Sequence, residues 1–205
     1  HIQEDPYTGF REFPTADYIA DHLQKMGYEV EKGKDIPYVK TTYDTQRPGP
    51  CLCVIGEMDS ILIDGPMHAC GHHVGCSVMM TVAQIIKEIQ PSHLSGKIVF
   101  MAVPAEEHME TNFRMELIQK NIIKYPSGKP ELLHRGLFDE VDLCMMVHMM
   151  PQEQEISMMT TANGNIIKEI TFTGKASHAG NAPQEGTNAL YAANLALNAI
   201  NALRE

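Results

Sequence analysis

Residues 97–108 read KIVFMAVPAEEH and join an apolar segment directly to a pair of carboxylates. The first seven residues are rich in Val, Ile and Phe, which is typical of a buried β-strand, and Pro104 ends the segment. The apolar segments at residues 51–56 and 141–147 have the same character, and we expect a buried strand at each. Shorter strands are expected at residues 28–30 and 37–43.

Segments of helical periodicity lie between these strands. Apolar side chains recur at helical spacing in residues 14–26 and 74–89, and the two segments end at Gly27 and Pro91. Shorter helices are expected at residues 112–120 and 131–137. Strands that alternate with helices indicate an α/β fold with a mixed, largely parallel central sheet flanked by helices.

The sequence pattern changes after Pro151. We predict strands at residues 156–160 and 166–173, a loop at residues 174–184 and an Ala-rich helix at residues 186–203. A domain boundary near residues 163–165 gives a first domain at residues 1–163 and the beginning of a second at residues 164–205. Because one strand and one helix cannot bury a core, we expect this second domain to be incomplete.

The composition excludes several classes of protein. The chain has 26 acidic and 16 basic residues and a net charge of −10, which argues against a nucleic-acid-binding protein. No apolar run approaches the ~18 residues of a membrane span, and the N-terminus has no signal segment. The five cysteines follow no disulfide pattern of a secreted protein. We therefore expect a cytoplasmic protein that binds neither nucleic acid nor membranes.

Three groups of ligand-type residues follow three of the predicted strands. Residues 67–73, MHACGHH, lie between the strand at residues 51–56 and the long helix. Glu106 and Glu107 come directly after the strand at residues 97–103, and His148 ends the strand at residues 141–147. In open α/β sheets the functional crevice lies beyond the carboxyl ends of the strands. One sheet would therefore bring all three groups to the same edge.

Each group has a functional and a structural interpretation. In an extended segment Cys70 and His72 point to the same side, so thiolate and imidazole can face one Zn²⁺-like ion. Glu106 and Glu107 point to opposite sides, so one can bind metal while the other acts as a general base. Taken singly, each group is better explained structurally. Cys70 and His72 would be a buried cysteine beside a histidine at the start of a helix, Glu106 and Glu107 a solvated acidic loop, and His148 a core histidine. Their convergence favours the functional interpretation.

In this order, residues 67–72, Glu106-Glu107, His148 and GKASHA at residues 174–179 resemble the motifs of the M20 metallopeptidases. The similar branch contains aminoacylase-like, indole-acetyl-amino-acid and aminobenzoyl-glutamate hydrolases, and the resemblance runs from about Tyr7 to the last residue. It implies a pair of divalent ions, Zn²⁺ or Mn²⁺, bound by Cys70, His72, Glu107 and His148. It also implies that Glu106 is the catalytic base and that Asp59 supports the site from outside the ligand shell.

The resemblance implies that the first domain has a zinc-exopeptidase-like fold. The last part of the chain resembles the beginning of the ferredoxin-like α+β lid domain that is inserted in the family. There the residue matching His178 reaches a neighbouring subunit's site and steadies the oxyanion, which implies a homodimer formed through the lid. Two features depart from the family. His73 stands where many relatives carry Asp, and the family's last metal-ligand histidine comes after the position matching Glu205. We therefore expect residues 1–205 alone to be inactive.

The resulting hypothesis is a metal-dependent hydrolase with a catalytic domain at residues 1–163. Its substrates would be small molecules with an amide bond: N-acyl amino acids, aminobenzoyl-glutamate-like compounds or dipeptides. Metal-activated water would attack the carbonyl, Glu106 would move the proton, and His178 would help to stabilise the oxyanion. The alternative is a non-catalytic relative or fragment that binds metal or a partner without turnover. A structural zinc module fits poorly, because the set has too many oxygen ligands and no Cys-x-x-Cys pair.

Overall fold

The computed structural model describes residues 1–150, 156–159, 161, 164 and 168–204 of the chain. It divides into two compact units, His1–Glu153 and Gln154–Glu205. Of the predicted domain boundary near residues 163–165, the structure describes only residue 164, and the boundary stays a prediction.

A five-stranded mixed sheet forms the centre of the first unit, in the order β1-β2-β6-β3-β7. The central strands β3 (Cys51–Glu57) and β6 (Lys97–Val103) are parallel, and β7 (Leu143–Met146) lies parallel to β3 on its other side. The strands β1 (Val30–Lys32) and β2 (Val39–Asp44) add an antiparallel edge beside β6. Because β6, β3 and β7 are parallel neighbours, their carboxyl ends lie at one edge of the sheet.

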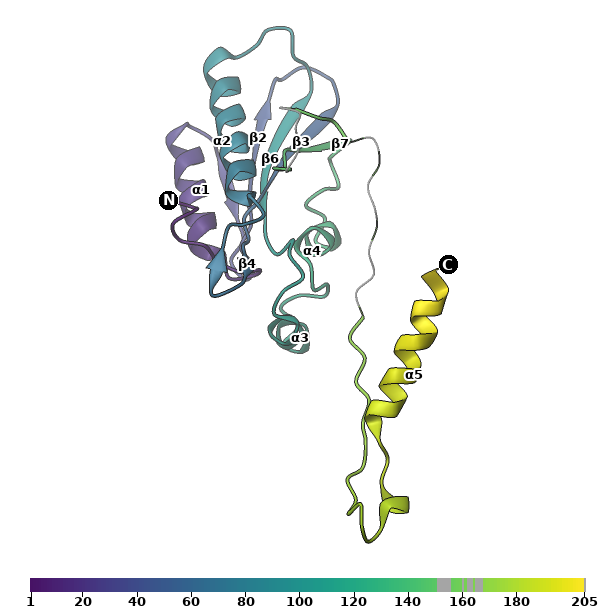
Figure 1. The fold of residues 1–205 in the computed structure, drawn as a ribbon. Coiled ribbons are helices and arrows are strands. Elements are labelled where there is room, and N and C mark those ends of the chain that lie inside the picture. The colour runs from purple at the N-terminus through teal and green to yellow at the C-terminus, as the bar shows by residue number, and fades with distance from the viewer. Residues whose placement is uncertain (151–155, 160, 162–163, 165–167, 205) are drawn as a thin grey trace. The chain divides into compact units, whose positions relative to one another are not determined.

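Helices cover both faces of this sheet (Figure 1). On one face α1 (Phe13–Lys25) and α2 (His72–Ile89) pack against Val54 and Phe100. On the other, α3 (Thr111–Gln119) and α4 (Gly128–His134) pack against residues such as Ile55 and Met101. Adjacent residues of β3 and β6 thus belong to opposite faces, as the period of two in a strand requires. The mixed, helix-flanked sheet expected from the sequence is confirmed.

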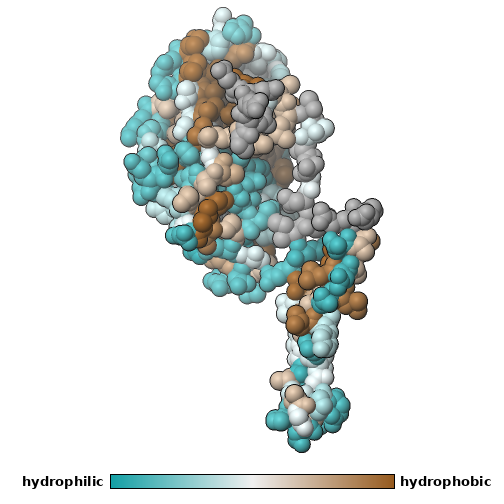
Figure 2. All heavy atoms as spheres, in the orientation of Figure 1, coloured by the Kyte–Doolittle hydropathy of each residue, from teal (hydrophilic) through white to brown (hydrophobic). Residues whose placement is uncertain are grey.

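The burial predicted for residues 141–147 is wrong. All four residues of β7 are exposed, including Leu143 and Met145. The reason is the position of β7, which is the edge strand and pairs with β3 alone within the described residues. Apolar residues also gather on the surface over α2, where Ile85 and Ile89 are exposed (Figure 2). A short hairpin, β4 (Ile61–Leu62) and β5 (Pro66–Met67), connects β3 to α2.

The second unit contains one long helix, α5 (Ala189–Asn201), which confirms the helix predicted at residues 186–203 in all but its ends. The Asn188 side chain caps it by accepting a hydrogen bond from the Leu190 backbone N–H at 2.9 Å. Short 3₁₀ turns occupy Pro183–Glu185 and Ala202–Arg204. None of the α5 residues is buried, and Figure 2 shows apolar residues on its surface.

The strands predicted in the second unit are absent where the structure describes their residues. Residues 156–159 and 168–173 form no strand, and residues 160, 166 and 167 lie outside the described part. An isolated bridge pairs Lys175 with Thr187. Whether a segment becomes a strand depends on pairing with a neighbouring strand, which its own alternating pattern does not specify. The ferredoxin-like lid stays a prediction. In the described ranges no helix is both long and apolar enough to cross a membrane.

Glu131 on α4 is a buried carboxylate whose contribution to the stability of the first unit can be tested. Its buried carboxylate accepts hydrogen bonds from the backbone N–H of Lys124 and Tyr125 at 2.8 and 2.9 Å, and from Arg135 Nε at 2.7 Å. Burial alone would raise the pKa of Glu131, but these hydrogen bonds lower it below its ordinary value. We expect Glu131→Gln to lower the free energy of unfolding at pH 7 by about 1–3 kcal/mol.

The sign of the pH dependence follows from the lowered pKa. Stabilisation by ionised Glu131 is complete above the ordinary pKa of 4.5 and is lost as the pH falls through the folded-state value. Urea unfolding of both proteins at pH 7 and at lower pH should show the difference shrinking below pH 4.5. Glu116→Gln, on the exposed surface of α3, is the control and should change stability little. A difference that grew on acidification would contradict this account.

Candidate metal centre

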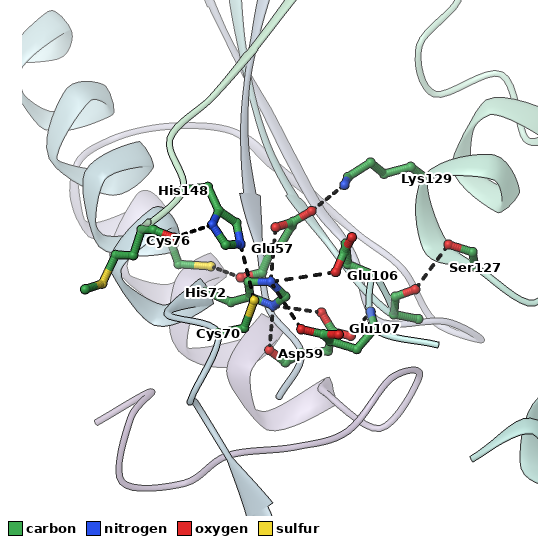
Figure 3. Close-up of polar contacts among 12 residues, drawn as sticks. Glu57, Asp59, Cys70, His72, Cys76, Glu106, Glu107, Ser127, Lys129 and His148 are labelled. Atoms are coloured by element: carbon green, nitrogen blue, oxygen red, sulfur yellow. Dashed lines mark hydrogen bonds and ion pairs between the residues drawn. The ribbon is translucent and has the colours of Figure 1, made fainter. Parts of the chain in front are cut away.

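The predicted site residues of the first unit meet at the carboxyl edge of the sheet (Figure 3). Glu106 and Glu107 follow β6, and His148 comes two residues after β7. Cys70 precedes α2, and His72 is the first residue of that helix. The Cys70 Sγ lies 3.3 Å from His148 Nε2, and the rings of His72 and His148 are 5.5 Å apart. Residues up to 78 positions apart in the chain are thereby brought together.

His72 is buried, and one ring nitrogen is held while the other faces the cluster. Its Nδ1 lies 2.9 Å from the Asp59 carbonyl oxygen and 3.2 Å from the Asp59 carboxylate. Within the described residues, Nε2 forms no hydrogen bond, although Glu57 Oε2 is 3.3 Å away. The carboxylates of Glu106 and Glu107 lie 3.8 and 3.9 Å from Nε2. Metal-binding histidines are typically held in this way, with the second nitrogen left for the ion.

Negative charge is concentrated around these ligands. Burial, together with the Glu107 carboxylate, raises the pKa of Cys70 to about 12. Burial and the charge of Glu57 raise the pKa of Glu106. Burial alone would lower the pKa of His72, but Asp59 and Glu57 raise it to about 9. The part of these shifts that comes from neighbouring carboxylates shows that the cluster favours added positive charge.

Two overlapping groups have the spacing of metal ligands. Cys70, His72 and His148 form one, and Glu57, His72 and Glu106 form the other, with the candidate ligand atoms of each group within 4.8 Å of one another. Thiolate and imidazole suit Zn²⁺, while carboxylate and imidazole also suit Mn²⁺. The unpartnered Nε2 of a buried histidine and the surrounding carboxylates fit divalent cations. The assignment of Glu107 as ligand and Glu106 as base stays a prediction, since Glu106 belongs to the second group.

Glu57 was missed by the sequence analysis. It is the last residue of β3, is buried, and forms an ion pair with Lys129 of α4 (Figure 3). The strand predicted at residues 51–56 stops one residue before Glu57. The signal was present, because a carboxylate at the carboxyl end of a central strand lies at the functional edge by the same rule that selected Glu106.

Of the remaining predicted residues, Asp59 lies at the site, whereas His178 lies in the second unit. Asp59 is buried, and its Oδ2 accepts a hydrogen bond from the Glu107 backbone N–H at 2.8 Å. It therefore contacts both His72 and the loop of the two glutamates, as a supporting residue should. His178 lies in the second unit, where its Nδ1 accepts a hydrogen bond from the Gly180 N–H at 3.2 Å. Its contribution to a catalytic site stays a prediction.

Fold and site together define an α/β protein with a metal-type cluster at the carboxyl edge of its sheet. The profile of peptidase family M20/M25/M40 matches residues 43–196, and the chain belongs to this family. The chain is 24% identical over 257 residues to indole-3-acetyl-aspartic acid hydrolase of Enterobacter agglomerans, covering 96% of this chain and 55% of the relative. It is 29% identical over 199 residues to human Xaa-Arg dipeptidase, covering 95% and 40%. The chain thus spans about half the length of the curated relatives it matches.

Solved structures share the fold. A methicillin-resistant Staphylococcus aureus protein assigned as an aminohydrolase matches with a TM-score of 0.66 and 25% identity, over 98% of this chain and 51% of that one. The Bacillus subtilis YXEP protein, described as a dinuclear metal-binding peptidase from the M20 family, matches with a TM-score of 0.55 and 21% identity, over 70% and 38%.

Proposed function

We propose that this protein acts as a metal-dependent amidohydrolase on N-acyl amino acids, aminobenzoyl-glutamate-like compounds or dipeptides. The observation that carries the proposal is the cluster of Cys70, His72 and His148 beside the Glu106 carboxylate. Hydrolysis of an amide needs a nucleophilic water, a base for its proton and positive charge opposite the carbonyl oxygen. The names of relatives such as indole-3-acetyl-aspartic acid hydrolase support the choice of an amide bond to an amino acid.

The residues of the site divide this chemistry among them. A pair of divalent ions held by Cys70, His72, His148 and a glutamate would supply Lewis acidity and lower the pKa of water. Glu106 is the general base, since its carboxylate is half-exposed at the cluster, and burial raises its pKa, which makes it a better proton acceptor. It takes a proton from the attacking water and returns it to the leaving amine. Asp59 fixes the ring of His72.

The proposal extends to parts of the molecule outside this cluster. His178 would stabilise the oxyanion in a neighbouring subunit's site, in a homodimer formed through residues 164–205. The metal would be Zn²⁺ or Mn²⁺, and the protein would be cytoplasmic. These statements rest on the sequence motifs and on the family to which the chain belongs.

A substrate panel tests the proposed activity. Full-length protein, supplied with Zn²⁺ or Mn²⁺, is incubated with N-acetyl and indole-3-acetyl amino acids, aminobenzoyl-glutamate and dipeptides, and the released amino acid is measured. We expect turnover of at least one class, abolished by a chelator and restored by metal. A phosphate monoester serves as the control substrate and should not be cleaved. Folded, metal-loaded protein that hydrolyses none of the amides would contradict the proposal.

A further inference from the structure

The loop that carries the two glutamates begins with an unusual backbone conformation. Ala105 connects β6 to Glu106 through Pro104, is completely buried and has φ of 53°. This left-handed conformation is uncommon for a residue with a Cβ and persists only where neighbouring contacts hold it. It turns the chain sharply at the strand end, so that both Glu106 and Glu107 lie within 4 Å of His72 Nε2.

Hydrogen bonds hold Ala105 from both sides. Its backbone N–H donates to Glu12 Oε1 at 2.8 Å, across 93 positions of sequence. Its carbonyl oxygen accepts from the Gly128 N–H at 3.1 Å and from the Ser127 hydroxyl at 3.3 Å, the latter drawn in Figure 3. Ser127 and Gly128, at the start of α4, thus hold the Ala105 carbonyl. Among the described residues, Glu12 alone holds the Ala105 amide.

Glu12 is placed where a carboxylate is costly. The residue is completely buried, and its second oxygen, Oε2, forms no hydrogen bond within the described residues. Burial and the nearby charge of Asp59 raise the pKa of Glu12 well above its ordinary value. A buried carboxyl group with one orphaned oxygen adds little to stability. Its hydrogen bond to the Ala105 N–H ties it to the loop of the glutamates, and the nearby charge of Arg114 favours its ionised form.

The segment around Glu12 fits closely behind this loop. A Cβ added to Gly9 would lie 2.9 Å from the Ala105 Cβ, so only glycine allows the approach. Arg114, which also borders Gly9, donates to the Glu107 carbonyl oxygen and to the Pro126 carbonyl oxygen at 2.6 Å. The segment before α1 and the side chain of Arg114 therefore form a backing for residues 105–107.

We propose that Glu12 is a positioning residue of the metal centre, which holds the Ala105 amide and thereby aims Glu106 and Glu107 at the ions. The inference rests on the proposed function. It assigns a role in the site to a residue that lies outside the ligand cluster and touches no ligand side chain. Because the bond needs only an acceptor oxygen, Gln at position 12 can replace Glu, whereas Leu cannot.

Cobalt(II) provides the test, since its absorption spectrum reports thiolate ligation and coordination geometry independently of activity. Glu12→Leu should change the visible spectrum of the bound Co²⁺ and weaken its affinity on the order of 10- to 100-fold, as loss of outer-shell support does. Glu12→Gln should restore both towards wild type. Glu131→Leu is the matched control, because Glu131 is also a buried carboxylate that accepts backbone N–H bonds, but to Lys124 and Tyr125. It should lower the unfolding midpoint without changing the spectrum.

The spectra and affinities of the variants decide whether Glu12 positions the metal centre. A folded Glu12→Leu protein with the wild-type spectrum and affinity would overturn the inference, as would equal spectral changes in Glu131→Leu. If Glu12→Leu does not fold, Glu12→Asp takes its place, since the shorter side chain withdraws the acceptor from Ala105 and should give the same spectral change. Wild-type protein that binds no Co²⁺ would instead refute the proposed function itself, so the two failures are distinguishable.

Discussion

Replacing Glu106 with Gln should lower kcat by about two to four orders of magnitude while the metal content stays unchanged. The amide has nearly the shape of the carboxylate, but it cannot accept the proton of the attacking water. Glu106 is the half-exposed carboxylate of the pair, at 39% side-chain exposure against 22% for Glu107, which is the accessibility that a base needs. Steady-state kinetics on the best substrate of the panel and metal analysis of the same sample measure the two effects.

Glu107→Gln gives the contrast that separates the two glutamates. Because Glu107 is a predicted metal ligand, the Glu107→Gln variant should lose metal as well as activity. Glu116→Gln, an exposed substitution on α3, should alter neither property. The test is demanding, because Glu106 rather than Glu107 belongs to a group with metal-ligand spacing. Metal loss in Glu106→Gln, with retention in Glu107→Gln, would reverse the proposed roles.

The second large effect concerns Cys70. Cys70→Ala should weaken divalent-metal affinity by at least about 100-fold, since even outer-shell substitutions cost 10- to 100-fold. The Sγ lies 3.3 Å from His148 Nε2 and belongs to the group of three ligands that includes His72. A methyl group offers no lone pair in its place. Competition titration against a chromophoric chelator measures the affinity.

Cys144→Ala is the matched control for this substitution. Cys144 is an exposed free thiol on β7 and is absent from both candidate ligand groups. Its removal should leave the affinity at the wild-type value. Unchanged affinity in Cys70→Ala, or an equal loss in Cys144→Ala, would exclude Cys70 as a ligand.

Much of the central sheet could be predicted from the sequence, for a local reason. Apolar runs bounded by Pro and Gly identify β3 and β6, and helical spacing identifies α2. The meeting of the ligand groups followed from the rule that parallel strands present their carboxyl ends at one edge. That rule needs only the order of the elements.

The features that escaped prediction depend on distant neighbours. The exposure of β7 is set by its place at the edge of the sheet, which an apolar run such as residues 141–147 does not reveal. The alternating pattern at residues 156–159 and 168–173 does not reveal whether a neighbouring strand pairs with them, and these residues form no strand. The bond from Ala105 to Glu12 joins residues 93 positions apart, and neither has a local signal for it. Glu57 had such a signal at the end of β3, but the predicted strand stopped one residue short.

Metal content is the most direct test of the account. Full-length protein is purified without chelators, equilibrated with Zn²⁺ or Mn²⁺, freed of unbound ions by gel filtration and analysed by elemental mass spectrometry against protein concentration. The account predicts about two divalent ions per chain, as in two-metal hydrolytic sites. Folded protein that retains no divalent ion would contradict the central claim that Cys70, His72, His148 and their neighbouring carboxylates form a metal centre.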